Sequence, residues 1–199
     1  MLILASKSAT RKTLLDNAGL AFSVASAPID EREIEARLLT AVENRKGLAK
    51  ELAKAKALAV SATRPGAWVI GADQTLTFGD EIVHKPRDFE DAVDRMTQMA
   101  GESHHLHSGA ALARDGEIVW SCVQSAVLTV KPLARAQIGA ILAREGDAIL
   151  SSVGGYRLEG PSVRLFSHIE GDYFTILGLP LLALLAAIET HAPELVEGQ

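Results

Sequence analysis

Hydrophobic residues occur along this chain in runs of two kinds, which predict strands and helices. Apolar runs typical of strands occupy residues 2–5, 22–25, 67–72, 75–78, 81–84, 108–113, 117–130 and 163–169. Apolar residues at helical spacing occur just before Gly19 and at residues 42–62, 88–99, 133–143 and 179–189. Gly79-Asp80 and Arg114-Asp115-Gly116 each separate two strand-like runs, so we expect a hairpin at both places. Strands and helices are therefore expected to follow one another in mixed order.

Asp73 is the first candidate for chemistry, because it directly follows a buried-looking strand. Residues 67–72 are almost entirely apolar, and we expect the strand to end there and to present Asp73 at its open end. Gly71 and Ala72 carry almost no side chain, so a substrate can approach the backbone closely. Alternatively, Asp73 only caps a turn, as aspartate often does.

The loop after the first strand combines hydroxyl groups with cations. Ser6, Ser8, Arg11 and Lys12 lie within seven residues of one another, at the start of a predicted helix. The helix macrodipole disfavours cations at that end, whereas backbone amides and hydroxyl groups there favour an anion. A bound phosphate would reconcile these tendencies. The alternative is that both cations point into solvent.

Two further segments are predicted to be loops. Residues 28–33 form an acidic run that is either a solvated surface or a place where Asp30 or Glu31 helps to hold a cation. Residues 151–161 are too rich in glycine for regular structure and are expected to form a functional loop.

Lys56 lies on the predicted helix 42–62, beside its apolar stripe. That stripe consists of Leu48, Leu52, Ala55 and Ala59. A lysine at the edge of such a stripe more often extends along it into solvent than binds a ligand. Lys56 therefore needs a second observation before it counts as a site residue.

Composition limits the classes of protein that fit. The 199 residues, 48% of them hydrophobic, can bury one core, and we expect a single domain over residues 1–199 with a frayed tail from about residue 193. A formal net charge of -5 argues against a dedicated nucleic-acid binder. The lone Cys122 excludes a disulfide framework, which favours the cytoplasm. Neither apolar end segment reaches the roughly 18 residues of a membrane span, so no membrane association is expected.

Several ordered segments together resemble one family. They are Leu4-Ala5-Ser6-Lys7-Ser8-Ala9-Thr10-Arg11-Lys12, Leu52-Ala53-Lys54-Ala55-Lys56-Ala57, Gly71-Ala72-Asp73-Gln74-Thr75, Lys85-Pro86, Gly154-Gly155-Tyr156 with Glu159-Gly160, and Glu170-Gly171-Asp172-Tyr173 with Leu177-Gly178-Leu179-Pro180-Leu181. Spread over nearly the whole chain, they resemble the Maf family of nucleoside triphosphate pyrophosphatases.

The resemblance implies a fold, an activity and a set of site residues. The fold would be α/β, a Maf/ITPase-like twisted mixed sheet flanked by helices, with two lobes around a cleft and often a homodimer. Asp73 would be the catalytic acid or base, and Glu31 with Asp73 would hold a divalent cation, Mg²⁺ or Mn²⁺. The substrate triphosphate would lie among Ser6, Ser8, Arg11, Lys56 and Lys85.

The resemblance also bears on which substrate is preferred. The proposed reaction is hydrolysis of the α–β phosphoanhydride to a nucleoside monophosphate and pyrophosphate. With Gln74 and Glu159 at these two positions, the chain resembles the subgroup of the family that acts on 7-methyl-GTP. That subgroup tends to have tryptophan where this chain has Thr10. A carboxylate such as Glu159 accepts from the paired N–H donors of guanine. The alternatives are a dTTP or UTP pyrophosphatase, a phosphatase or nucleotidyltransferase, and a non-catalytic nucleotide-binding regulator of cell division.

Three positions depart from the family pattern. Ala9 stands where proline is usual, and Thr175 replaces a frequent asparagine. Ser151 stands where many members have a second aspartate, so a metal site that includes this position is in doubt.

Overall fold

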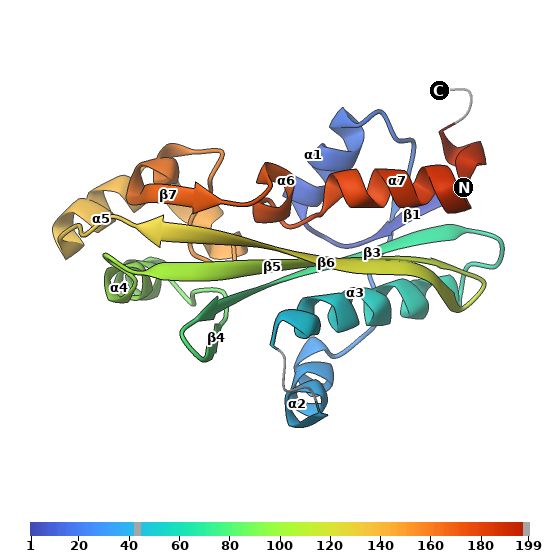
Figure 1. Ribbon diagram of the computed structural model, residues 1–199, viewed down its shortest axis with the longest axis horizontal. Coiled ribbons are helices and arrows are strands. Elements are labelled where there is room, and N and C mark those ends of the chain that lie inside the picture. The colour runs from blue at the N-terminus through green and yellow to red at the C-terminus, as the bar shows by residue number, and fades with distance from the viewer. Residues whose placement is uncertain (42–44, 197–199) are drawn as a thin grey trace. The chain divides into compact units, whose positions relative to one another are not determined.

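The structure is a computed structural model that describes residues 1–41 and 45–196 (Figure 1). Its strands are β1 Leu2–Ala5, β2 Ser23–Val24, β3 Trp68–Phe78, β4 Glu81–Val83, β5 Ser103–Arg114, β6 Glu117–Val130 and β7 Phe166–Glu170. Its α-helices are α1 Ala9–Asn17, α2 Glu31–Ala41, α3 Lys46–Ser61, α4 Phe89–Gln98, α5 Arg135–Leu142, α6 Tyr173–Ile176 and α7 Leu181–His191. Short 3₁₀ helices occupy η1 Gly146–Ser151, η2 Pro161–Leu165 and η3 Pro193–Leu195.

The strands form one mixed sheet of seven, in the order β2-β1-β3-β5-β6-β7, with β4 paired to β3. β1 runs parallel to both β2 and β3, whereas β3 pairs antiparallel with β4 and β6 with β7. The expected mixed sheet flanked by helices is thus confirmed. No helix among residues 1–41 and 45–196 is long and apolar enough to cross a membrane.

The chain divides into two compact units, and the strands β3, β5 and β6 contribute residues to both. The first unit comprises residues 1–74, 107–124 and 172–199, and the second comprises residues 75–106 and 125–171. The assignment of residues 1–199 to a single domain stays a prediction.

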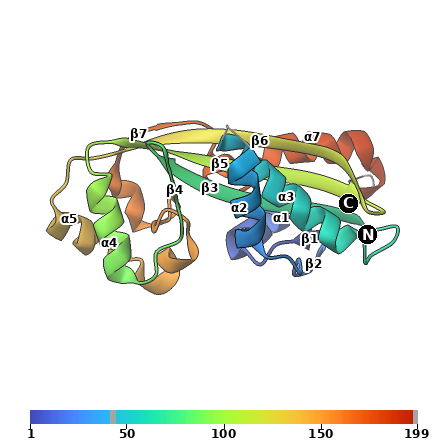
Figure 2. The same ribbon diagram turned by 90° about the horizontal axis from the view of Figure 1, so that it is seen from below.

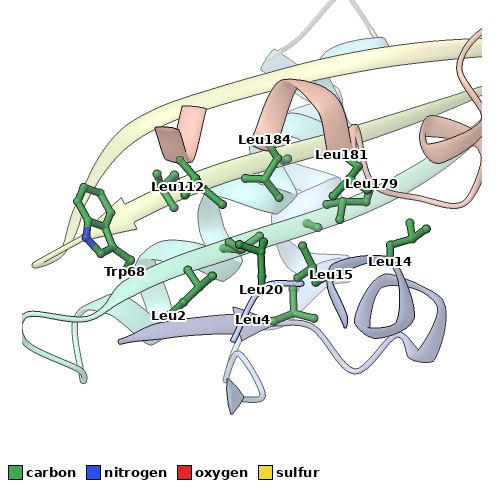
Figure 3. Close-up of a cluster of buried hydrophobic side chains, with 14 of the residues drawn as sticks. Leu2, Leu4, Leu14, Leu15, Leu20, Trp68, Leu112, Leu179, Leu181 and Leu184 are labelled. Carbon is green, nitrogen blue, oxygen red and sulfur yellow. The ribbon is translucent and has the colours of Figure 1, made fainter. Parts of the chain in front are cut away.

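Within the first unit, the alternation of side chains along the strands builds a core on each face of the sheet. Leu2, Leu4 and Ile70 point to one face, where they pack with leucines of α1 and α7 (Figure 3). Ile3 and Val69 point to the other face, which α3 covers. Figure 2 shows α3 and α7 on opposite sides of the sheet. Each fully buried aliphatic side chain of this kind contributes about 1.5–3 kcal/mol.

Segments rich in turn-forming residues are where the structure differs from expectation. Residues 28–33 are not all loop, because α2 begins at Glu31 and the Asp30 carboxylate accepts hydrogen bonds from the amides of Arg32 and Glu33. An aspartate followed by glutamates is a helix start as well as a solvated run. The helix expected over 42–62 begins at Lys46, and residues 42–44 lie outside the described part.

The ends of the last strand and of the chain also differ from expectation. The strand expected at 163–169 is β7 from Phe166, preceded by η2. The tail expected to fray from residue 193 begins instead with η3. There Trp68 Nε1 donates to Glu194 Oε1 at 2.7 Å, which attaches the tail to β3. Residues 197–199 lie outside the described part.

Candidate active site

Asp73 is not at the end of a strand, contrary to expectation, but in the middle of β3. Gly71 and Asp73 are residues typical of turns, but β3 continues past them because it pairs with β5 and then with β4. What ends near Asp73 is the neighbouring strand, since the last residue of β1, Ala5, pairs with Gly71. From Ala72 onward, next to Asp73, β3 no longer pairs with β1.

Three charged side chains, from α2, α3 and β3, meet beside this part of β3. Lys56 Nζ of α3 lies 2.9 Å from Glu31 Oε1 of α2 and 3.1 Å from Asp73 Oδ1 of β3. The side chain of Lys56 is only 9% exposed and that of Asp73 13%, whereas that of Glu31 is 55% exposed. Lys56 therefore does not extend into solvent. It joins two carboxylates in a partly buried cluster, the second observation that the sequence argument required.

The position of Lys56 depends on how closely α3 lies against the sheet. A Cβ atom added to Gly71 would lie 2.0 Å from the carbonyl oxygen of Ala53 and 2.7 Å from the amide nitrogen of Ala57. Only glycine permits this approach. The buried stripe is accordingly rotated from the expected one, with Ala53 and Ala57 against the strand instead of Ala55 and Ala59. This rotation turns the neighbouring Lys56 towards Asp73.

Arg11 is buried and joins three segments, so the alternative that both cations point into solvent is wrong. Its Nε donates to Gly178 O at 2.8 Å, and its Nη1 donates to Ala72 O at 3.0 Å and to Ser6 Oγ at 3.1 Å. Burial lowers the pKa of Arg11, and the negative charges of Asp73 and Glu31 oppose that shift. The guanidinium thus places a positive charge at the backbone of Ala72, close enough to interact electrostatically with the Asp73 carboxylate.

The serines shape the loop between β1 and α1. Ser6 Oγ accepts from the Ser8 amide at 3.3 Å, and Ser8 caps α1 by accepting from the Arg11 amide at 3.3 Å. Thr10 is half-buried in the first turn of that helix. Lys12, in contrast, is exposed and pairs with Asp16 at 2.7 Å. Of the two cations considered for a phosphate, only Arg11 points into the protein.

Gln74 points to the opposite face of β3 from Asp73, as the alternation of a strand requires. Its Nε2 donates to Ile176 O at 2.9 Å, to Ser108 Oγ at 3.1 Å and to Thr175 O at 3.2 Å. Sequence reasoning missed Ser108 and did not foresee α6. The single signal was Thr175, singled out only as a departure from the family pattern.

Two expected site residues belong to the second unit. Lys85 is exposed just after β4. Glu159 Oε1 accepts from Arg157 Nε at 3.3 Å, in a loop that Glu145 holds by accepting from the Ser162 amide at 2.8 Å. Ser151, which replaces the family's aspartate, donates to Ala148 O and ends η1.

The two carboxylates that contact Lys56 are oxygen ligands of the kind that a hard divalent cation prefers. Mg²⁺ is commonly held by one or two carboxylates together with substrate phosphates, and Glu31 with Asp73 supplies two carboxylates in contact with one ammonium group. No group of three or more histidine, cysteine or acidic side chains able to hold a metal occurs among residues 1–41 and 45–196. A cation here would accordingly depend on phosphate oxygens to complete its coordination.

Comparison with known proteins identifies the family. A protein from Brucella suis biovar 1 (strain 1330) named 7-methyl-GTP pyrophosphatase is 52% identical over 187 residues, covering 94% of each chain. One of the same name from Rhizobium etli is 50% identical over 187 residues, again covering 94% of each. A protein named nucleoside triphosphate pyrophosphatase from Bradyrhizobium diazoefficiens is 47% identical, over 96% of this chain and 93% of its own. The Maf-like protein family matches residues 1–191, and the chain belongs to that family.

Proposed function

We propose that this protein is a metal-dependent nucleoside triphosphate pyrophosphatase that favours a guanine-type substrate such as 7-methyl-GTP. The observation that carries the proposal is the Glu31–Lys56–Asp73 cluster, placed beside the buried Arg11 where β1 ends. The names of the relatives at 47–52% identity support the same reaction.

Asp73 would act on the water that attacks the α-phosphorus. Its carboxylate orients the water and takes up a proton as the new P–O bond forms, while the bond to the bridging oxygen breaks and pyrophosphate leaves. Displacement at phosphorus needs positioning and charge neutralisation more than covalent chemistry. The Lys56 ammonium and the Arg11 guanidinium supply fixed positive charge next to Asp73. A divalent cation held by Glu31 and Asp73 would neutralise further charge on the phosphates.

The test of the reaction is product analysis. Purified protein is incubated with 7-methyl-GTP, GTP, dTTP and UTP, each with Mg²⁺ or Mn²⁺ and with neither metal. We expect equal amounts of nucleoside monophosphate and pyrophosphate, and no turnover without metal. Inorganic phosphate as the first product would indicate a phosphatase instead. Tight nucleotide binding without any turnover would favour a non-catalytic regulator.

The base preference has its own test. We propose that Glu159 accepts from guanine N–H donors, for which it must share its carboxylate with Arg157. The double change Gln74→Thr with Glu159→Gln should move the preference from 7-methyl-GTP or GTP towards dTTP and UTP. A wild-type protein that prefers dTTP or UTP, or a variant with an unchanged order of substrates, would contradict this assignment.

Location and assembly complete the proposal. A nucleoside triphosphate substrate and a lone cysteine fit a cytoplasmic protein without disulfides. The homodimer that the family resemblance implies stays a prediction, which sedimentation velocity would check.

A further inference from the structure

A short segment of the second unit, residues 84–87, joins β4 to the cap of α4 and carries Lys85. Pro86 within this segment is buried, and its ring fixes the backbone φ at that position. Its neighbour Lys85 is exposed. The segment thus faces the protein at Pro86, while the cation beside it faces solvent.

Two side chains of α4 hold the backbone at the two ends of this segment. Asp91 Oδ2 accepts from the Arg87 amide at 2.9 Å, and Arg95 Nη1 donates to His84 O. The two side chains also pair with each other, because Arg95 Nη2 lies 2.7 Å from Asp91 Oδ2. We call Asp91 and Arg95 the α4 pair. Through this pair, one helix ties both ends of the segment that carries the lysine.

The α4 pair differs from an ordinary ion pair on a helix surface. Opposite charges four residues apart normally stabilise only their own helix, and they contribute little. The side chain of Asp91, however, is only 13% exposed. The hydrogen bond from the Arg87 amide, opposed by partial burial and reinforced by Arg95, lowers the pKa of Asp91. Asp91 therefore stays charged at neutral pH and keeps both contacts.

The glycine-rich loop restricts the same segment from another direction. A Cβ atom at Gly155 would lie 3.2 Å from Ala92 Cβ of α4 and 3.4 Å from Pro86 Cγ. Gly155 adopts a φ of 68°, which favours glycine. Gly155 therefore lies against both Ala92 and Pro86, and the proline ring has little room to move on that side.

The charges around the segment leave one cation available. Arg95 and Arg87 approach Asp91 Oδ2 at 2.7 and 3.6 Å. Lys85, in contrast, has no carboxylate partner among the residues that the structure describes. A cation on a restrained backbone loses less conformational freedom when it binds an anion than one on a mobile loop. The contacts of the α4 pair thus suit Lys85 to bind an anionic ligand.

We propose that Asp91 and Arg95 are positioning residues, which hold Lys85 where its ammonium group binds a phosphate group of the substrate. This inference rests on the proposed function, because the role of Lys85 at the triphosphate is itself a prediction. The α4 pair touches no substrate in this arrangement and acts only through Lys85. Its effect on phosphate binding must therefore disappear when the lysine is absent, whereas a merely structural pair would have the same effect with or without it.

A double-mutant cycle of Arg95→Met and Lys85→Ala tests this dependence. Calorimetry measures the dissociation constant of inorganic tripolyphosphate with Mg²⁺ for the wild type, both single variants and the double variant, and kinetics measures KM for the preferred nucleoside triphosphate. Arg95→Met alone should raise both constants at least about threefold. In the Lys85→Ala background, the same change should raise them by less than about 1.5-fold.

Asp91→Ala tests the pair from its other member, with a measurement that needs no ligand. It removes the acceptor of the Arg87 amide, so that amide should exchange hydrogen at least about tenfold faster. Tripolyphosphate should bind at least about threefold more weakly, as in Arg95→Met. If Arg95→Met does not fold, Arg95→Lys takes its place, because it keeps a charge beside Asp91 but lacks the second nitrogen that donates to His84 O.

Arg135→Met is the matched control. Arg135 also pairs with α4, because its Nη2 lies 2.7 Å from Glu90 Oε2 and 2.8 Å from Asp94 Oδ1. It has no hydrogen bond to residues 84–87 in the described part of the chain. The variant loses ion pairs of the same helix, yet it should change neither the exchange of the Arg87 amide nor tripolyphosphate binding.

Two kinds of result would overturn this inference. The first is a loss of tripolyphosphate affinity in Arg95→Met that is equally large in the Lys85→Ala background, which would make the α4 pair structural only. The second is an unchanged affinity in Arg95→Met and Asp91→Ala, or in Lys85→Ala itself, as would be a wild-type protein that binds no tripolyphosphate.

Failure of the proposed function is a separate result, because calorimetry with tripolyphosphate requires no turnover. Coupling between Arg95 and Lys85 in a protein that hydrolyses none of the nucleoside triphosphates would support the positioning role and remove the pyrophosphatase activity. Hydrolysis without such coupling would support the activity and remove the positioning role.

Discussion

Asp73 shows how much one side chain depends on its partners. It shares the Lys56 ammonium with Glu31, and the buried guanidinium of Arg11 lies behind the preceding residue. The two cations would offset the repulsion between this carboxylate and a strongly negative substrate. Proton uptake from water and attraction of a cation are therefore both within reach of this one group.

Asp73→Asn tests the first of these roles. Asparagine has the same shape but cannot take up the proton of the attacking water, so kcat should fall by about 10²-fold to 10⁴-fold. Circular dichroism and nucleotide binding should remain close to those of the wild type. A variant that retains more than about half of the wild-type kcat would remove Asp73 from the mechanism.

Lys56→Met tests how the cluster handles a cation. The ammonium contacts the two carboxylates proposed as metal ligands, and at a separation of about 4 Å two unit charges interact by about 4 kcal/mol even at an effective dielectric constant of 20. Without nucleotide, the variant should bind Mn²⁺ at least about tenfold more tightly by calorimetry, although its turnover falls. Lys54→Met is the control, because Lys54 pairs with Glu51 on the same helix. Unchanged or weaker Mn²⁺ binding in Lys56→Met would show that the cation lies elsewhere.

His104 in the second unit makes stability depend on pH. Its Nε2 lies 2.7 Å from Tyr156 Oη, its Nδ1 is buried without a partner in the described part of the chain, and burial lowers its pKa from 6.5 to about 4. The unfolded chain takes up a proton below about pH 6.5, whereas the folded protein resists protonation down to about pH 4. The free energy of unfolding should fall through this window by about 1.4 kcal/mol per pH unit.

Urea unfolding at pH 7, 5.5 and 4.5 measures this contribution. His104→Gln should be less stable than the wild type at pH 7, and the gap should narrow as pH falls because glutamine does not titrate. A gap that stays constant with pH would mean that His104 is protonated as readily in the folded protein as in the unfolded chain.

At the scale of elements, the close packing of α3 on the sheet is what brings Lys56 to Asp73. Two glycines permit it, since a Cβ atom at Gly109 would lie 2.3 Å from Ala49 O, much as one at Gly71 would meet Ala53 O. These contacts are with backbone atoms, which cannot rotate away as a flexible side chain can. The helix can only move as a whole, and Lys56 would move with it.

Gly71→Ala should therefore destabilise the protein by more than the 1–3 kcal/mol that overpacking in a core typically costs. Gly139→Ala is the matched control. Gly139 lies in the interior of α5, and its Cβ would meet the methyl groups of Val93 at 3.9 Å, an ordinary van der Waals contact. Alanine there should be neutral or stabilising by up to about 1 kcal/mol. The urea unfolding midpoints of the two variants measure this difference. Equal stability of the two variants would show that α3 can move to accommodate the added methyl group at residue 71.

At the scale of the whole molecule, the expected cations are divided between the two compact units. Lys85 belongs to the second unit and is exposed. Lys85→Ala should lower kcat/KM for the triphosphate by an amount equivalent to about 1.5–3 kcal/mol of transition-state stabilisation, the value of a hydrogen bond to a charged group. It should leave the urea midpoint unchanged. Lys131→Ala, in the same unit, is the control and should leave kcat/KM unchanged. Equal weakening of nucleoside and triphosphate binding would show that Lys85 does not act on phosphate.

The pattern of apolar residues determined the strands and which face of the sheet each side chain meets. Leu2, Leu4 and Ile70 are buried on one face and Ile3 and Val69 on the other, because alternation along a strand is a local property. The turn at 114–116 was equally predictable, since Asp115 and Gly116 adopt φ values of 51° and 81° that aspartate and glycine tolerate best. Asp73 stood out in the sequence for a local reason, because it follows an apolar strand, whereas Lys56 stood out only through the family resemblance.

Only the tertiary structure decided how those positions are used. Asp73 looked like the end of a strand, yet what ends there is its neighbour β1, and register between strands is not a property of either segment alone. Lys56 looked like a surface lysine until the approach of α3 at Gly71 turned it inward. Gln74 gains its partners from Ser108 and from Thr175 and Ile176, which lie 34 to 102 residues away along the chain. Packing between distant segments sets such contacts, and local propensity carries no information about it.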